Sequence, residues 1–274
     1  MTTQDNALIF DCDGVLADTE RFGHLPAFNK AFDDAGIPLH WTEQDYAELV
    51  KIGGGKERIT AALDAARTHG NADDERLQTT SVPALHKAKT EIYRAMVSAG
   101  VMPPRPGVAR LIRSALAAGW KVAVASTSAP ESVKSVLDSV VGTETASAIP
   151  IFAGDIVPAK KPAPDIYEIA LAELGVTAEH AVVIEDSAVG LQAAVSAGLT
   201  CIVTPSSYTL REDFTFAAAV VTSLGEPSDP LSVISDRYAV DFGLQSMVTI
   251  DSLERLLKHR NVTRPTTKIS GEHR

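Results

Sequence analysis

The sequence predicts an α/β protein in which a doubly wound, Rossmann-like parallel sheet carries an inserted α-helical cap domain. Short apolar runs typical of buried parallel strands alternate with helical patterns. These runs lie at 7–10, 121–125, 149–153, 181–184 and 200–203. About a hundred residues with helical periodicity separate the first run from the second, which is too long for one crossover connection and indicates an insertion.

The helices that cover the sheet are predicted by apolar stripes of helical spacing. The first stripe ends at Gly119, and Ser128 and Glu131 have capping-box spacing ahead of the second. Near the end of the chain, Val248 to Leu257 predicts a last short strand and a helix capped near Asp251. The two stripes consist of Val108, Leu111, Ile112 and Ala115, and of Val133, Val136, Leu137 and Val140.

Two apolar stripes and a third helix at 82–99 predict that the insertion is helical. Residues 17–21 and the proline-rich 103–107 read as the linkers that join it to the sheet domain. We therefore expect a core of 1–18 and 104–260, a cap of 19–103 that closes over a site, and a polar, disordered tail of 261–274. The two stripes are Phe22, Leu25, Phe28, Phe32 and Ala35, stopped by Gly36 and Pro38, and Ile59, Ala62, Leu63 and Ala66.

Composition excludes several classes of protein. The chain has 274 residues, 45% of them hydrophobic, and its formal net charge of −10 repels phosphodiester backbones, so we expect no nucleic-acid partner. No run approaches the roughly 18 apolar residues of a membrane span, and no signal peptide is recognisable. We expect no membrane contact and a cytoplasmic location, or an organellar stroma if a transit peptide has been removed. Cys12 and Cys201 are too isolated for a disulfide framework or a thiolate metal site.

Two carboxylates directly follow the first predicted strand, in the string Asp11-Cys12-Asp13-Gly14. The carboxyl edge of such a sheet is where α/β proteins place their ligands. On its own the string is also compatible with an ordinary surface turn. A calcium loop is disfavoured, because the further oxygen ligands of an EF-hand loop are missing.

Three later elements at the same sheet edge favour chemistry over a turn. Ser126 and Thr127 end one strand and offer hydroxyls and backbone N–H groups to a phosphate. Lys161 stands between prolines as a fixed positive charge, although Lys160 and Lys161 could also be a solvated pair. Glu185 and Asp186 end an apolar strand, where their burial requires a compensating cation. Oxygen ligands alone predict Mg²⁺ as the cofactor rather than zinc.

These groups together suit phosphoryl transfer. One Asp can attack phosphorus to form an aspartyl-phosphate, while the metal and Lys161 neutralise the phosphoryl oxygens. Asp13 can protonate the leaving oxygen and then activate water.

The four elements, in this order and with a helical insert after the first, resemble the haloacid dehalogenase superfamily of phosphohydrolases over about residues 7 to 225. That resemblance implies that Asp11 is the nucleophile and Asp13 the acid and base. It also implies that Ser126 and Lys161 bind the phosphoryl group. The implied magnesium ligands are Asp11, the Asp13 carbonyl, Glu185 and Asp186.

Longer stretches resemble the CbbY branch of that superfamily. They are FDCDGVLADTE, KIGGGKERI, STSAPESV, FAGDIVPAKKPAPDIY and VIEDSAVGLQAA. Members of this branch are implied to convert xylulose 1,5-bisphosphate to xylulose 5-phosphate and phosphate. The expected partner is thus a small sugar phosphate, and the expected oligomeric state is a monomer.

A bisphosphate needs cations for its second phosphate, and the insert offers Lys51, Lys56 and Arg58 around the turn 53–55. The alternative is a loop with ordinary surface lysines. Resemblance to β-phosphoglucomutases implies that Lys56 stands where an arginine binds the distal phosphate, and that Lys89 stands where another cap lysine points inward. Further candidate substrate contacts are Asp18, Glu20, His24, Thr127 and Ser128. Two positions depart from relatives: Gly23 stands where many carry a histidine, and Ala129 replaces a common asparagine.

Alternatives to the bisphosphatase remain open at this stage. A phosphomutase of the β-phosphoglucomutase kind would share the whole catalytic set, and a phosphatase with broader sugar-monophosphate substrates would differ only in its cap. A catalytically idle binding protein is disfavoured, because Asp11, Asp13 and Lys161 are all present.

Overall fold

The core is a seven-stranded sheet in the order β3-β2-β1-β4-β5-β6-β7. The computed structural model describes residues 5–52, 54–68, 75–236 and 246–263. The first six strands are parallel and β7 is antiparallel to β6, which confirms the predicted doubly wound sheet. The strands are β1 (Ala7–Phe10), β2 (Lys121–Ser126), β3 (Ile151–Ala153), β4 (Ala181–Glu185), β5 (Thr200–Val203), β6 (Ala219–Val221) and β7 (Val233–Asp236).

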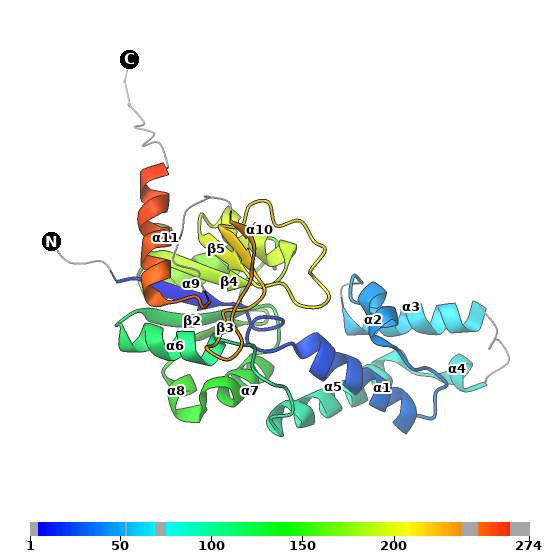
Figure 1. Cartoon of the computed structure of the whole chain (residues 1–274). Coiled ribbons are helices and arrows are strands. Elements are labelled where there is room, and N and C mark those ends of the chain that lie inside the picture. Colours follow the sequence, from blue (N-terminus) through cyan, green and yellow to red (C-terminus); the bar gives the residue numbers. More distant parts are fainter. Residues whose placement is uncertain (1–4, 53, 69–74, 237–245, 264–274) are drawn as a thin grey trace, which may run out of the picture.

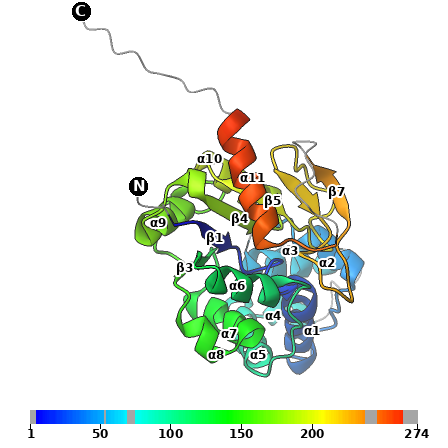
Figure 2. The ribbon, with the colours of Figure 1, turned by 60° about the vertical axis from the view of Figure 1, so that its left-hand side comes forward.

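Helices cover both faces of this sheet (Figures 1 and 2). Successive strand residues point to opposite faces, so Leu8 and Phe10 pack in one cluster while Ala7 and Ile9 pack in the other. The first cluster includes residues of α6 (Val108–Ala117), α7 (Pro130–Val141), α8 (Thr143–Ser147) and α11 (Ile250–Thr263). The second includes residues of α9 (Asp165–Leu174) and α10 (Ala188–Ser196), and a short 3₁₀ turn, η2 (Ala178–His180), precedes β4.

A separate helical unit lies beside the sheet (Figure 1). It has its own core, in which Phe28, Phe32 and Trp41 pack together with Tyr46 and Leu63. Its two connections to the sheet domain run side by side, because Ala17 pairs with Pro104. The helices of the unit are η1 (Glu20–His24), α1 (Leu25–Asp34), α2 (Glu43–Leu49), α3 (Gly55–Thr68), α4 (Glu75–Thr79) and α5 (Val82–Ser98), all within the segment predicted as the cap.

Two local predictions about helices are wrong. Ser128 and Glu131 do not form a capping box, because α7 begins after Ala129 with Pro130 in its first turn, and the Ser128 hydroxyl donates to Asp13 instead. Phe22 does not join the apolar stripe of α1. The first turn, η1, is π-helical, which changes the angular spacing of its side chains, and Phe22 is 40% exposed.

The C-terminal predictions also differ from the structure. Val248 does not begin a strand, and the last helix begins at Ile250 rather than being capped at Asp251. Thr249 and Ser252 close its first turn by reciprocal bonds, with the Ser252 amide donating to the Thr249 hydroxyl and the Thr249 amide to the Ser252 hydroxyl. Helix α11 continues to Thr263, past the predicted start of the tail, and residues 264–274 of that tail lie outside the described residues.

Candidate active site

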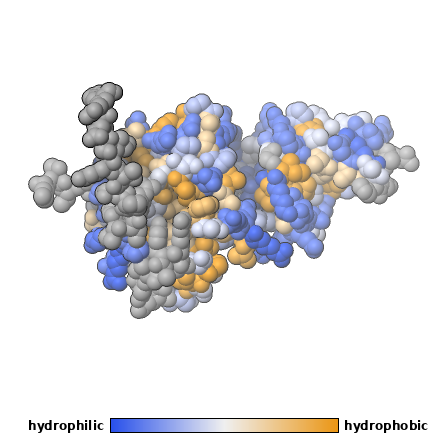
Figure 3. Space-filling view, turned by 90° about the horizontal axis from the view of Figure 1, so that it is seen from above, coloured by the Kyte–Doolittle hydropathy of each residue, from blue (hydrophilic) through white to orange (hydrophobic). Residues whose placement is uncertain are grey.

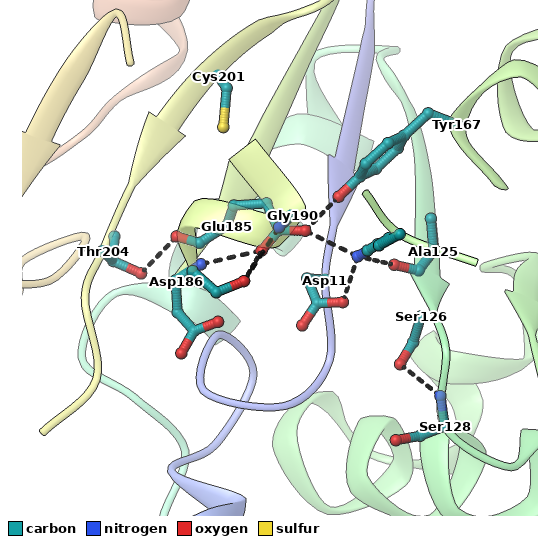
Figure 4. Close-up of polar contacts among 12 residues, drawn as sticks. Asp11, Ala125, Ser126, Ser128, Tyr167, Glu185, Asp186, Gly190, Cys201 and Thr204 are labelled. Atoms are coloured by element: carbon teal, nitrogen blue, oxygen red, sulfur yellow. Dashed lines mark hydrogen bonds and ion pairs between the residues drawn. The ribbon is translucent and has the colours of Figure 1, made fainter. Parts of the chain in front are cut away.

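Three carboxylates converge at the carboxyl edge of the sheet, around one small space (Figure 4). Asp11 follows β1, Glu185 ends β4, and Asp186 comes next in the chain. They meet because β1 and β4 are neighbouring parallel strands, in a register that pairs Phe10 with Ile184. One oxygen of each carboxylate lies within 4.8 Å of the others. The structure thus brings together three of the four residues predicted to bind metal.

Lys161 lies between two of these carboxylates. Its Nζ is 2.6 Å from Asp11 Oδ1 and 2.7 Å from Glu185 Oε1, and it also donates to the Ala125 carbonyl at 3.1 Å. The Tyr167 hydroxyl donates to the same Glu185 oxygen at 2.5 Å. Although burial disfavours its charge, Asp11 and Glu185 keep the pKa of Lys161 above its ordinary value. Lys161 is therefore a buried cation rather than part of a solvated lysine pair.

The carboxylates carry more negative charge than Lys161 balances. Burial raises the pKa of Asp11 to about 7, although Lys161 opposes this effect. Burial, followed by the charges of Glu185 and Asp11, raises the pKa of Asp186 well above its ordinary value. Three buried carboxylates against one lysine are unfavourable unless another cation lies among them. Oxygen donors of this kind fit a hard divalent cation.

Glycine at two positions leaves room for these carboxylates. A Cβ on Gly14, whose φ is +77°, would lie 2.1 Å from Asp186 Oδ2. A Cβ on Gly190, in the first turn of α10, would lie 2.0 Å from the Glu185 carboxyl carbon. The backbone therefore approaches both carboxylates more closely than any other residue would allow. This close approach supports a built cation site, because an accidental acidic cluster does not require it.

Asp13, the predicted acid and base, is held by two hydroxyls. The Thr19 hydroxyl donates to Asp13 Oδ1 at 2.6 Å, and the Ser128 hydroxyl donates to Oδ2. The Ser126 hydroxyl accepts from the Ser128 amide at 3.2 Å, so the turn after β2 reaches the Asp13 side chain. Both oxygens of the Asp13 carboxylate are oriented before any ligand binds.

A cleft of about 1340 Å³ opens over these residues. Hydrophilic residues gather where the two lobes of the molecule meet (Figure 3). The helical unit contributes Glu20 and Arg58 to the cleft wall. Arg58 donates to the Tyr46 hydroxyl at 2.8 Å and lies 3.3 Å from Glu20, and the Tyr46 hydroxyl in turn donates to Glu20 at 2.5 Å. The core residues predicted as sites that line the cleft are Asp11, Asp13, Ser126, Thr127, Lys161, Glu185 and Asp186.

Five predicted substrate contacts are not among the described residues that line the cleft: Asp18, His24, Lys56, Lys89 and Ser128. Lys56 is exposed at the start of α3. Lys89 is buried, with its Nζ 2.6 Å from His24 Nδ1 and 4.4 Å from the centre of the Phe28 ring. Burial lowers the pKa of Lys89 to about 8 and that of His24 well below its ordinary value.

Sequence reasoning missed several residues of the site. Nothing in the sequence marked Tyr167 as a site residue, because an aromatic residue in the first turn of a helix is typical of a core position. Thr19 directly follows Asp18 in a predicted linker, and only the folded turn places its hydroxyl on Asp13. Gly190 stands five residues beyond Glu185, and a helical glycine in that position is the one cue that the sequence offered.

The class of protein follows from this fold and site together with a family comparison. The family profile of haloacid dehalogenase-like hydrolases matches residues 6–198. The chain therefore belongs to the haloacid dehalogenase-like hydrolase family, and it is a phosphatase of that family.

Several relatives of this chain belong to one branch of the family, the CbbY proteins. A CBBY-like protein of Arabidopsis thaliana is 47% identical over 230 residues, covering 84% of this chain and 72% of that protein. CbbY of Cereibacter sphaeroides is 41% identical over 221 residues, covering 80% of this chain and 93% of its own. A crystal structure of a CbbY variant from Rhodobacter sphaeroides in complex with xylulose 1,5-bisphosphate is similar at a TM-score of 0.67 and 40% identity, covering 82% and 98% of the two chains. These similarities confirm the predicted CbbY resemblance.

None of the described helices has both the length and the apolar character that crossing a bilayer requires.

Proposed function

We propose that this protein is a Mg²⁺-dependent phosphatase that converts xylulose 1,5-bisphosphate to xylulose 5-phosphate and phosphate through an aspartyl-phosphate on Asp11. The observation that carries the chemistry is the position of Lys161, which touches Asp11 at 2.6 Å in a buried site whose other members are carboxylates. The substrate is inferred from the similar CbbY structure that holds this bisphosphate.

In the proposed reaction, the two aspartates act in turn. An Asp11 carboxylate oxygen attacks phosphorus, and the bond from phosphorus to the sugar oxygen breaks. Asp13 gives that oxygen a proton. The Asp13 carboxylate then takes a proton from water as the water attacks phosphorus, which releases phosphate and restores Asp11. The hydroxyls of Thr19 and Ser128 hold Asp13 in place for both transfers.

Lys161 and Ser126 bind the phosphoryl oxygens in this scheme. Lys161 supplies a full charge from a site where water is largely excluded, which strengthens its attraction for charge that develops on phosphorus. Mg²⁺, held by Asp11, Glu185, Asp186 and the Asp13 carbonyl, would supply further neutralisation of the phosphoryl group.

The cleft wall formed by the helical unit offers cations for the second phosphate of the proposed substrate. Lys51 and Arg58 line it from the helical unit. Arg58 is partly neutralised by Glu20, so an incoming phosphate would compete with that carboxylate for the guanidinium. We assign the distal phosphate to this wall, with Glu20 left to accept hydrogen bonds from sugar hydroxyls.

A substrate panel tests the proposal. Purified protein with Mg²⁺ is assayed for phosphate release from xylulose 1,5-bisphosphate, from sugar monophosphates and from β-glucose 1-phosphate, the last also with a bisphosphate activator. We expect the highest kcat/KM on xylulose 1,5-bisphosphate. Preference for a monophosphate would discard the bisphosphate assignment, and efficient formation of glucose 6-phosphate would indicate a mutase.

The nucleophile is tested by Asp11→Asn. We expect the loss of Mg²⁺-dependent phosphate release on every substrate in the panel, and persistent release from the purified variant would refute the assignment of Asp11. We also propose that the protein is a monomer. Size-exclusion chromatography with light scattering checks that expectation.

A further inference from the structure

Arg105 lies in the return linker, one residue after the pairing of Ala17 with Pro104. Its amide donates to the Leu16 carbonyl at 3.0 Å, which joins the two linkers. Its guanidinium is partly buried and donates to four backbone carbonyls, one of them that of Gly14 in the nucleophile turn. The others are Thr204 at 2.6 Å, Pro205 at 3.0 Å and Thr222 at 3.0 Å. One side chain therefore connects the linker, the nucleophile turn and the segment after β5.

The segment after β5 leads from this arginine to the site. Its first residue, Thr204, lies beside Glu185 and Asp186 in Figure 4, and its amide donates to the Glu185 carbonyl at 2.7 Å. The Thr209 hydroxyl donates to Asp186 Oδ2 at 3.4 Å, and the Ser206 hydroxyl lies 3.0 Å from the Thr209 hydroxyl. Asp186 is thus oriented by a loop whose base Arg105 holds.

The same loop also touches the cap side of the molecule. The Ser207 hydroxyl lies 3.4 Å from Asp18 Oδ2, in the outgoing linker. The Tyr208 ring packs edge-on against Tyr46 of the helical unit, with ring centres 5.5 Å apart. Consecutive residues of one loop therefore contact the carboxylate site, the linker and the cap.

We propose that Arg105 is a positioning residue for the phosphatase reaction, holding loop 204–209 against the nucleophile turn so that Asp186 points into the cation site. This inference rests on the proposed function. An arginine suits the task because its planar fork can donate to several carbonyls at once, whereas a lysine offers one nitrogen. Its charge also lies near those of Asp186 and Asp18.

The first test is Arg105→Lys, with Arg105→Gln as a second variant should the first fail to fold. Mg²⁺ affinity is measured by calorimetry without substrate, and kcat and KM are measured with p-nitrophenyl phosphate, which carries no second phosphate. We expect Mg²⁺ affinity to weaken by about tenfold and kcat to fall, with KM within about twofold of the wild type. This size corresponds to the loss of one or two hydrogen bonds from a charged donor.

Arg110 provides a matched control. It lies five residues later, in α6, and donates to three carbonyls, those of Val248, Leu224 and Gly225, and its nearby carboxylate is Glu226 rather than one of the site. Arg110→Lys likewise removes a planar guanidinium that donates to several carbonyls. We expect lower thermal stability in this variant, with Mg²⁺ affinity and kcat within about twofold of the wild type.

A double-mutant cycle separates positioning from a general loss of stability. Thr209→Val removes the bond from the loop to Asp186 without touching Arg105. If Arg105 acts through this loop, the Mg²⁺ affinity of Arg105→Lys combined with Thr209→Val is weakened by clearly less than the product of the single effects.

Two results would overturn the inference. One is an Arg105 variant that keeps wild-type Mg²⁺ affinity and kcat. The other is a double variant whose Mg²⁺ affinity is weakened by the full product of the two single effects. Failure of the proposed function is distinguishable from both. A wild-type protein that binds Mg²⁺ but releases no phosphate would refute the phosphatase, while the Mg²⁺ affinities of the variants would still report on Arg105.

Discussion

Gly190 and Glu185 are packed so closely that a single added carbon at position 190 would lie 2.0 Å from the Glu185 carboxyl carbon. Glu185 cannot easily move away, because one of its oxygens accepts from both Lys161 and Tyr167. The other accepts from the Asp186 amide at 3.1 Å. The backbone of α10 and the carboxylate of β4 therefore define each other's position.

This packing predicts the effect of Gly190→Ala. The methyl group must displace the Glu185 carboxylate from Lys161, because the helix backbone cannot shift without breaking its own bonds. We expect kcat with Mg²⁺ to fall at least about tenfold, and stability to fall by about 1–3 kcal/mol from overpacking. Gly198→Ala is the control for the loss of a glycine, since its nearest neighbour would be 3.8 Å away, although its φ of +73° costs some stability. Equal kcat values for the two variants would contradict the prediction.

Removing one carboxylate should stabilise the metal-free protein. The pKa of Asp186 is raised by burial and by the charges of Glu185 and Asp11, so the buried, metal-free site disfavours its ionised form. Asp186→Asn should therefore raise the melting temperature in EDTA. The wild type should gain about 2.7 kcal/mol from Mg²⁺ at a hundred times its Kd, and the variant should gain almost none. Differential scanning calorimetry with and without Mg²⁺ measures both effects, and equal Mg²⁺ stabilisation in the two proteins would argue against the site.

Lys161 and its neighbour Lys160 offer a matched comparison. Lys161→Met leaves Asp11 and Glu185 without their shared cation, and removing one partner of a buried ion pair costs about 3–5 kcal/mol. Lys160 pairs with Asp155 at the surface, and Lys160→Met should change stability by less than about 1 kcal/mol. Urea unfolding in the absence of Mg²⁺ gives both values. Similar losses in the two variants would show that the buried contacts contribute no more than exposed ones.

Thr19 should affect turnover more than substrate binding. Its hydroxyl holds the Asp13 carboxylate at 2.6 Å, and Thr19→Val has nearly the same shape without the donor. A hydrogen bond to a charged group contributes about 1.5–3 kcal/mol, so we expect kcat to fall by roughly tenfold or more with little change in KM. Thr19→Ser restores the donor and should recover most of the activity. Failure of serine to rescue kcat would mean that the methyl group matters more than the hydroxyl.

Lys89 predicts an unusual dependence of stability on pH. Burial lowers its pKa from 10.5 to about 8, which costs the charged form about 3 kcal/mol at about 1.4 kcal/mol for each pH unit. Between about pH 8 and 10.5 the unfolded chain binds a proton that the folded protein has lost, so stability should rise with pH across this window.

Lys89→Met should abolish that rise and increase stability at pH 7, because no charge is then buried. Lys87→Met, an exposed position on the same helix, is the control and should keep the wild-type pH dependence. Urea unfolding at pH 7, 8 and 9.5 gives the slopes. If the two variants showed the same dependence of stability on pH, Lys89 would not be the source of the predicted rise.

Much of the fold was readable from local patterns. The runs at 7–10, 181–184 and 200–203 became strands within a residue of their predicted limits, because a buried parallel strand is apolar at every position. Strands β6 and β7 were not predicted. They have three and four residues, β7 exposes Val233 and Ile234, and such short or half-exposed segments carry little periodic signal.

The carboxylates of the candidate site were also readable, since they stand at or shortly after the ends of apolar strands and parallel strands end at one edge. The side chains of the helical unit were readable only in part. The predicted contact Arg58 lies in the cleft wall, whereas Lys56, two residues earlier, is exposed and is not among the described residues that line the cleft, because the direction of a helical side chain depends on how its helix packs.

The sequence by itself determined the first five strands, the helices that alternate with them and which carboxylates would meet at the sheet edge, because hydrophobic periodicity and strand ends are local properties. Only the tertiary structure decided what orients them. Thr19 and Ser128 reach Asp13, Tyr167 reaches Glu185, and Arg105 ties the linker to loop 204–209. Those contacts join segments far apart in the chain, and hydrogen bonds act over a few ångströms, so they exist only once the sheet, its crossovers and the helical unit have packed.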